Sequence, residues 1–193
     1  MTAGSIPLRC AFALLAGALF VAGHPALAAA TDADAATMDW SDLRRTGAPG
    51  IAAVRELWKD RLEAAQRQWN PIGTPSATMP AFTLTHTFAE VEPAVLVSIL
   101  FNMFDCELPG NGPGSNLYAR CPMRVVTGTA GAGRVQSFVG VCHLYVPPTK
   151  PGEGPDPSKN YTAVSLDATR TLRVRVVQFG RPVPGCNGDY RLE

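Results

Sequence analysis

The residues best suited to chemistry are the cysteines and a histidine that directly follows one of them. In "CPMRVVTGTAGAGRVQSFVGVCHLYV", residues 121–146, two cysteines bracket a glycine-rich turn and His143 follows Cys142. A thiol beside an imidazole suits a nucleophile with its base, half of a metal site, or half of a disulfide. Because neighbouring side chains of a strand point to opposite faces, Cys142 and His143 cannot exchange a proton directly. We therefore predict no catalytic dyad here.

The cysteine count favours disulfides over a metal or redox site. Of the five cysteines, Cys10 lies in an N-terminal segment that we expect to be removed. The other four form an even set without Cys-x-x-Cys spacing, which predicts two disulfides, no metal and no cofactor. We predict that Cys106 pairs with Cys121 around a glycine-rich loop and that Cys142 pairs with Cys186 to anchor the tail. A cross-strand Cys121–Cys142 bridge is the alternative, if the hairpin turn has two residues.

The N-terminus has the pattern of a secretory signal peptide. Arg9 precedes the apolar run "CAFALLAGALFVAG", and "ALA" at 26–28 fits a cleavage site. The run is short for a membrane span, which needs about 20 apolar residues. We predict a signal peptide over 1–28, a loose polar leader over 29–48, a single domain over 49–193, and no stable membrane span after cleavage. The expected location is the bacterial periplasm or the extracellular medium, where disulfides persist.

The charge balance argues against bulk nucleic-acid binding. The chain has 17 Lys and Arg against 16 Asp and Glu, and loss of Arg9 (17 − 1) leaves 16 of each sign. Nucleophile-elbow, His-Glu-x-x-His and phosphate-loop patterns are absent. "GTAGAGR" shares only its glycines with a phosphate loop, because no helix follows it to supply a positive N-terminus. We therefore assign no catalytic residue with these motifs.

Apolar periodicity predicts two helices. In residues 49–70 an apolar stripe recurs at spacings of three and four, which indicates an amphipathic helix. Its members are Ile51, Val54, Leu57, Trp58, Leu62, Ala65 and Trp69. "EPAVLVSILFNMF" starts with Pro93, which suits a first helical position, and repeats its apolar residues at four. We expect a second, buried helix over 93–104, with a buried strand as the competing interpretation of so short an apolar run.

The remaining segments read as strands and loops. Residues 82–88 alternate phenylalanine, leucine and histidine with threonine, which predicts a half-buried strand. The two predicted hairpins pair 123–130 with 134–146 and 161–166 with 171–179. The proline-rich stretch 147–160 is expected to be an exposed loop, and the tail to be irregular. Together the elements predict an α+β fold, in which the two helices pack on an antiparallel sheet of about five strands.

Two acid–base arrangements deserve a place among the alternatives. His86 lies on the apolar side of its strand, and Glu90 or Glu92 follows closely enough to pair with it as in a general acid–base site. Asp105 and Glu107 flank Cys106 and would share a face if the segment were extended. A core histidine and surface acids beside a disulfide are the competing interpretations, which we favour.

Binding residues are predicted on one loop and one strand. "ELPGNGPGSNLYAR" lies between two cysteines, and a stapled loop loses less entropy on binding. Arginines alternate with apolar residues in "RTLRVRV", so they should share the outer face of the last strand as an anion- or partner-binding patch. The candidate binding residues are Asn111, Asn116, Tyr118, Arg170, Arg173 and Arg175.

These features predict an exported, disulfide-stapled protein that binds another exported protein, such as an inhibitor or immunity protein of an exported enzyme. One alternative is a small-ligand carrier with a pocket between helix and sheet, lined by His86 and residues 93–104. The other is a small hydrolase or isomerase that uses His86 with Glu90 or Glu92.

Overall fold

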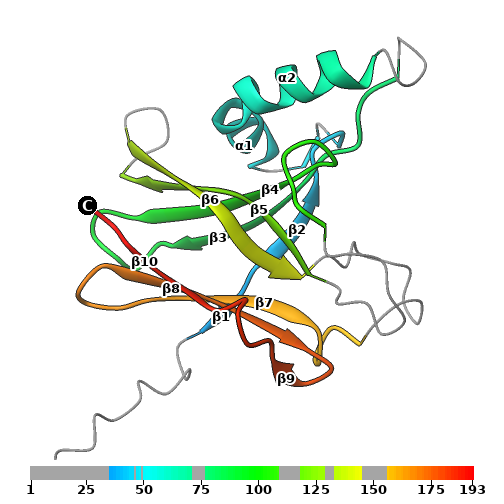
Figure 1. Ribbon diagram of the computed structural model, residues 1–193. Coiled ribbons are helices and arrows are strands. Elements are labelled where there is room, and N and C mark those ends of the chain that lie inside the picture. The colour runs from blue at the N-terminus through cyan, green and yellow to red at the C-terminus, as the bar shows by residue number, and fades with distance from the viewer. Residues whose placement is uncertain are drawn as a thin grey trace, which may run out of the picture. The chain divides into compact units, whose positions relative to one another are not determined.

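Two antiparallel sheets make up most of the fold, and two short helices lie against one of them (Figure 1). The computed structural model describes residues 35–45, 47–48, 50–70, 77–108, 118–128, 133–144 and 156–193. All of these residues belong to one unit, Asp32–Glu193. The predicted signal peptide and the first part of the polar leader lie outside the described residues. No helix in the described ranges is long and apolar enough to cross a membrane.

Each sheet has five strands, and every pair of neighbours is antiparallel. Sheet A contains, in order, β1 (Ala36–Thr37), β7 (Tyr161–Leu166), β8 (Thr171–Gln178) and β10 (Gly188–Arg191), with β9 (Arg181–Pro182) also on β8. Sheet B contains, in order, β2 (Asp39–Asp42), β3 (Phe82–Phe88), β4 (Val95–Phe101), β5 (Tyr118–Thr127) and β6 (Arg134–Leu144). The chain passes from sheet A to sheet B between β1 and β2, at Met38.

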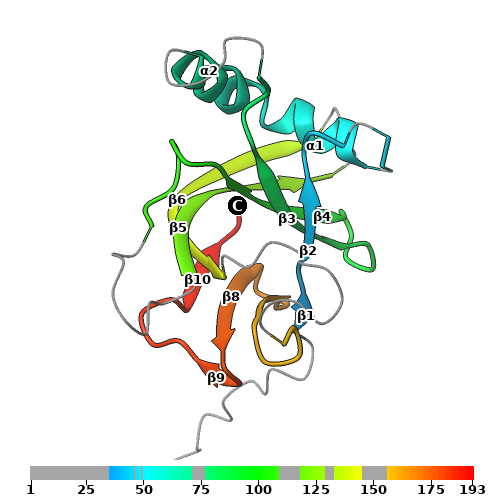
Figure 2. The same ribbon diagram turned by 90° about the vertical axis from the view of Figure 1, so that its right-hand side faces the viewer.

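The two sheets face each other (Figure 2), and their inner faces share one apolar core. Sheet B contributes residues such as Leu84, Val97 and Met123, and sheet A contributes Val164 and Val174. All five are at most 1% exposed. Burial of this alternating set supplies the main driving force for pairing the sheets, at roughly 25 cal/mol per Å² of apolar surface.

The helices cover the outer face of sheet B (Figure 2). The predicted apolar stripe forms a second cluster with Leu100 of β4 and Ala81. The helix is divided at Trp58 into α1 (Ile51–Leu57) and α2 (Lys59–Trp69). At this break the Arg124 guanidinium donates a hydrogen bond to the carbonyl of Leu57 and lies 4.6 Å from the Trp58 ring centroid. The strand beneath thus compensates for an interrupted helical ladder.

A buried polar chain fastens the helices to the sheet. The Trp58 indole donates to the hydroxyl of Ser98 at 2.8 Å, and Ser98 and Thr83 exchange a second 2.8 Å hydrogen bond. Thr83 also donates to the carbonyl of Ile99 at 3.1 Å. Thr83 and Ser98 are both 0% exposed. These hydrogen bonds therefore satisfy buried hydroxyl groups that would otherwise destabilise the layer between helix and sheet.

The predicted α+β fold is wrong, because the second helix does not form and a second sheet does. Residues 95–101 are strand β4, paired with β3 on one side and β5 on the other. Its residues alternate between the core shared by the sheets and the layer beneath the helices. A strand buried on both faces needs no polar side, so its apolar run has no visible period of two.

The two predicted hairpins are confirmed, whereas the prediction of an irregular C-terminal tail is wrong. Phe138 pairs with Met123 in the first hairpin, and Val174 pairs with Val164 in the second. The tail returns as β10, which extends sheet A beside β8. Leu192 follows it into the core at 3% exposure.

Candidate functional site

Both predicted disulfides are confirmed, and their pairing is the one expected. Cys106 bonds to Cys121 across 15 positions, and Cys142 bonds to Cys186 across 44. The first joins the turn after β4 to β5. The second joins β6 of sheet B to the segment that precedes β10 of sheet A. Two disulfides fit an oxidising compartment.

The register of the first hairpin, which includes a bulge at Pro122, explains why Cys121 and Cys142 do not form a cross-strand bridge. Cys121 pairs with Val141 while Met123 pairs with Phe138, so two β6 residues oppose the single Pro122. Proline has no N–H for the ladder, and a bulge is one of the few places where a sheet accepts it. Gly140 supplies the φ of 65° that the bulge requires. Cys142 is thereby placed opposite Arg120.

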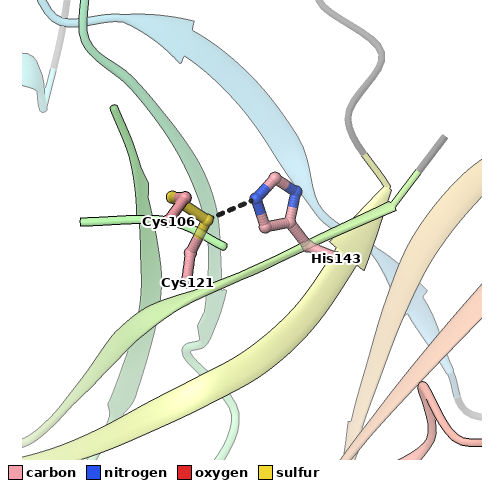
Figure 3. Close-up of side chains that lie close together, drawn as sticks. All are labelled: Cys106, Cys121 and His143. Atoms are coloured by element: carbon pink, nitrogen blue, oxygen red, sulfur yellow. Dashed lines mark hydrogen bonds between the residues drawn. A yellow bond between two sulfur atoms is a disulfide. The ribbon is translucent and has the colours of Figure 1, made fainter. Parts of the chain in front are cut away.

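The same register brings His143 to the other disulfide. His143 pairs with Ala119, so its ring lies diagonally across the ladder from Cys121. Its Nε2 atom is 3.2 Å from the Cys121 Sγ atom (Figure 3). Cys142 is bonded to Cys186, and the contact of His143 with Cys121 was not foreseen.

His143 is fully buried in an aromatic cage. It is 0% exposed, and its ring meets Trp40 and Phe101 edge-on at centroid distances of 5.7 and 5.8 Å. Its Nδ1 atom lies 2.9 Å from the Leu144 carbonyl oxygen. Burial lowers the pKa of His143 from 6.5 to about 4, against a smaller opposing effect of the Leu144 carbonyl. The imidazole is therefore neutral at neutral pH.

A groove of about 360 Å³ lies between the helices and the segments that flank them. Its volume falls within the usual range of small-molecule sites, about 300–1,000 Å³. Its apolar residues are Leu43, Leu62, Met79 and Ala81. Its polar residues are Arg44, Arg55, Glu63, Gln66, Arg67 and Thr78. Neither His86 nor residues 93–104 line it.

The lining of this groove carries three guanidinium groups and one carboxylate. Arg44 is engaged by Asp42, with N–O distances of 2.9 and 2.8 Å, and this hydrogen bonding lowers the pKa of Asp42. Arg55 donates to the carbonyl of Leu43 and has no carboxylate partner among the described residues. Arg67 likewise has no ion pair in the described part of the chain. The groove is thus a net cationic site over an apolar base.

Gln66 fixes the far wall of the groove. Its side-chain oxygen accepts from the Met79 N–H at 2.8 Å, and its amide nitrogen donates to the Ala77 carbonyl at 3.0 Å. The segment that leads into β3 is therefore held against α2 by a side chain acting on two backbone groups. A wall held in this way is preformed, which lowers the entropy cost of binding a ligand.

Two of the three arginines in the predicted patch form ion pairs with neighbouring aspartates. Arg173 lies 2.8 Å from a carboxylate oxygen of Asp167, and Arg175 lies 2.8 Å from one of Asp189. Arg170 differs, because its Nε and Nη2 atoms are buried without a hydrogen-bond partner among the described residues. Tyr118 packs beside the Cys142–Cys186 cluster. Asn111 and Asn116 lie outside the described residues, and the binding role of all six remains a prediction.

Among the described residues, the side chains predicted as acid–base pairs do not contact one another through the hydrogen bonds that a general acid–base site would require. The His86 ring packs on Phe88 at a centroid distance of 4.6 Å. No hydrogen bond or ion pair joins it to Glu90 or Glu92, all three being described. Asp105 pairs with Arg61 at 3.1 Å and accepts from Asn102, which ties the turn after β4 to α2.

The outer edge of β6 is the most exposed apolar stretch of the sheets. Among the described strands β6 ends sheet B, so none pairs with this edge. Val139, at the bulge, is 83% exposed and Val135 is 49% exposed. Gln136 contacts the chain's last residue through a 3.0 Å hydrogen bond from the Glu193 N–H.

Comparison with known proteins leaves the chain without an assigned family: no family model, curated protein or solved structure matches it.

Proposed function

We propose that the protein is an exported binding protein whose groove beside α1 and α2 holds a small anionic amphiphile. The ligand would carry a carboxylate or phosphate at one end and an apolar body. The observation that carries this proposal is a groove of about 360 Å³ whose apolar base is bordered by three arginines and one glutamate. Export rests on the pattern of residues 1–28 and on the two disulfides.

The charges decide the ligand class. Arg55 and Arg67 approach the groove from different helices, and neither has a carboxylate partner among the described residues. A guanidinium holds an oxyanion through charge-assisted hydrogen bonds, which are about twice as strong as neutral ones. Leu43 and Met79 are only 1% and 3% exposed, so the base of the groove is already packed and need not be ordered on binding. The partly exposed Leu62 presents apolar surface to a ligand.

Titration calorimetry with three probes of equal chain length tests this proposal: decanoate, decanol and decyltrimethylammonium. Decanoate should bind one per chain, decanol more weakly, and the cationic probe not measurably. Arg67→Gln should weaken decanoate about tenfold, since one charge-assisted hydrogen bond contributes about 1.5 kcal/mol. Decanol affinity should not change in this variant, because the apolar floor is intact.

Arg181→Gln is the matched control, because it removes the same charge from an exposed position on β9 of sheet A. Its decanoate affinity should equal that of the unchanged protein. Equal binding of all three probes, or an unchanged affinity in Arg67→Gln, would exclude an anion-selective groove.

A second candidate function is binding of another exported protein, as an inhibitor or immunity protein does. The open edge of β6 favours it, because an edge strand with exposed valines can accept an extended segment of a partner as an added strand. In this proposal Val135 and Val139 contact side chains of the added strand. The binding role predicted for the arginine and loop residues belongs to this candidate function.

Affinity capture from the exported protein fraction, with three baits, tests the second candidate. The double variant Val135→Lys/Val139→Lys should lose a partner that the unchanged protein retains. Phe179→Lys is the control, since it adds one lysine at a residue that is 67% exposed but lies off the edge. A captured enzyme should also lose activity on addition of the protein. Retention of every partner by the double variant would rule out the β6 edge.

A further inference from the structure

Three atoms of the kind that bind soft metals converge in the core of sheet B. The Sγ atoms of Cys106 and Cys121 and a ring nitrogen of His143 all lie within 4.8 Å of one another (Figure 3). They come from three segments: the turn after β4, strand β5 and strand β6. Cys121 and His143 are each 0% exposed, so the protein core holds these two side chains in place.

The hydrogen bonding of His143 leaves one ring nitrogen without a donor. The Leu144 carbonyl oxygen accepts only, so Nδ1, 2.9 Å away, must carry the proton. Nε2 then presents a lone pair to the Cys121 Sγ atom at 3.2 Å. A disulfide sulfur has no hydrogen to donate. The disulfide form therefore buries a strong acceptor aimed at a group that cannot satisfy it.

We propose that, once a dithiol reductant opens the Cys106–Cys121 disulfide, Cys106, Cys121 and His143 bind one divalent metal ion with the preferences of Zn²⁺. In the first step the reductant transfers two electrons and two protons to the disulfide and becomes a disulfide itself. In the second step the metal ion binds both sulfurs as thiolates and Nε2 as a neutral ligand. Two protons, one from each thiol, are released to solvent.

The charge of the pocket selects a divalent ion. Two thiolates and a neutral imidazole carry a charge of −2, which a divalent ion cancels and a monovalent ion does not. Cancellation matters because the aromatic cage of Trp40 and Phe101 excludes water, and an unbalanced buried charge is costly. Sulfur and nitrogen ligands are those that Zn²⁺ takes in proteins. The Leu144 carbonyl would orient the ligating histidine as outer partners of metal-bound histidines do.

The geometry asks for a movement at Cys106. Thiolates that share a tetrahedral zinc lie about 3.8 Å apart, given Zn–S bonds of about 2.3 Å. Cys121 is fixed within β5, whereas Cys106 is only partly buried and follows the turn at Met103–Asp105. We therefore assign the adjustment to Cys106. Three protein ligands leave a fourth position, which water or another small ligand would reach from the side of the partly buried Cys106, away from the aromatic cage.

Cobalt titration of the phosphine-reduced protein, without oxygen, tests the inference. Co²⁺ should bind one per chain with thiolate-to-cobalt absorption in the near ultraviolet and tetrahedral bands in the visible. Zn²⁺ should displace it, and about two protons per metal should appear in weakly buffered solution. The oxidised protein should show none of this.

Matched variants locate the site. Cys142→Ala/Cys186→Ala keeps all three ligands and should retain the spectrum. Cys106→Ala/Cys121→Ala should abolish it, and His143→Leu should lower the Co²⁺ affinity at least tenfold while circular dichroism shows a folded chain. The inference is overturned if the reduced protein gives no thiolate–cobalt band. It is equally overturned if the band is lost with Cys142 and Cys186, or if the affinity of folded His143→Leu is unchanged.

Discussion

The two disulfides are the same bond in opposite surroundings. Cys142–Cys186 sits among Leu144 and Val176, and it links sheet B to sheet A. Cys106–Cys121 stays on the sheet B side and faces the buried base His143. The first arrangement offers a covalent link and apolar packing. The second adds a buried imidazole whose charge depends on pH.

The comparison separates the mechanical contribution of a disulfide from its chemical environment. On chain entropy alone, the longer closed loop restricts the unfolded chain more. The separations are 44 for Cys142–Cys186 and 15 for Cys106–Cys121, and the two loops do not overlap along the chain. Their contributions to stability should therefore add, at about 4 and about 3 kcal/mol respectively.

The largest expected effect is loss of the link between the sheets. Cys142→Ala/Cys186→Ala should lower the free energy of unfolding by about 4 kcal/mol, and Cys106→Ala/Cys121→Ala by about 3 kcal/mol. Guanidinium unfolding without reductant, followed by circular dichroism, measures both. Because the variants remove the same atoms, the difference reports what each bond joins. A larger loss for Cys106→Ala/Cys121→Ala would contradict the loop-length account.

The next largest effect is a pH dependence of stability that arises from His143. We expect no such dependence from the surroundings of the Cys142–Cys186 disulfide. Its folded pKa of about 4 lies below the unfolded value of 6.5, so between these values the unfolded chain binds the proton. Stability is then complete above pH 6.5 and is lost as the pH falls toward 4. The total loss is about 3 kcal/mol, at 1.36 kcal/mol per pKa unit. The ring faces Trp40, Phe101, Cys121 and Leu144, none of them charged.

Denaturant midpoints of the oxidised protein between pH 7 and pH 4 measure this effect. His143→Leu should remove most of the pH dependence over that interval, whereas Cys142→Ala/Cys186→Ala should keep it on a lower baseline. A pH dependence that survives His143→Leu would place the acid-sensitive group elsewhere.

The elements that the sequence predicted correctly are those whose partners lie nearby in the chain. The alternation in residues 82–88 reports the face that packs in the shared core, although Thr83 on the other face is buried as well. The second hairpin turns at Asp167, whose carboxylate accepts from the Thr169 and Thr171 N–H groups. The disulfide pairing followed from the closure of a glycine-rich loop and the need to anchor a tail.

The elements that it missed depend on what covers them. Strand β4 is continuous in apolar residues because α1, α2 and sheet A cover both faces, and no local pattern shows a second covering layer. The contact of His143 with Cys121 depends on the bulge, for which Pro122 within a strand was the available signal. The groove joins Arg44, Arg67 and Met79 from separate segments, and only the folded chain brings these together.

The smallest expected effect tests whether the link between the sheets includes more than the disulfide. The Leu144 N–H donates to the Thr162 hydroxyl at 2.8 Å, so this bond joins β6 to β7 close to Cys142. Thr162→Val keeps the shape but leaves a buried donor without an acceptor, which should cost about 1–2 kcal/mol. Thr87→Val, at an exposed position of β3, should change stability by less than about 0.5 kcal/mol.

The cost of Thr162→Val should fall when Cys142 and Cys186 are alanine. Without the disulfide β6 can move away from β7 and let water reach the Leu144 N–H, so the two changes should show a coupling of at least about 0.5 kcal/mol. The same double-mutant cycle with Cys106→Ala/Cys121→Ala should show no coupling, because that disulfide does not hold β6 to sheet A. Equal coupling in the two cycles would mean that the disulfides act on one shared core rather than on two distinct regions.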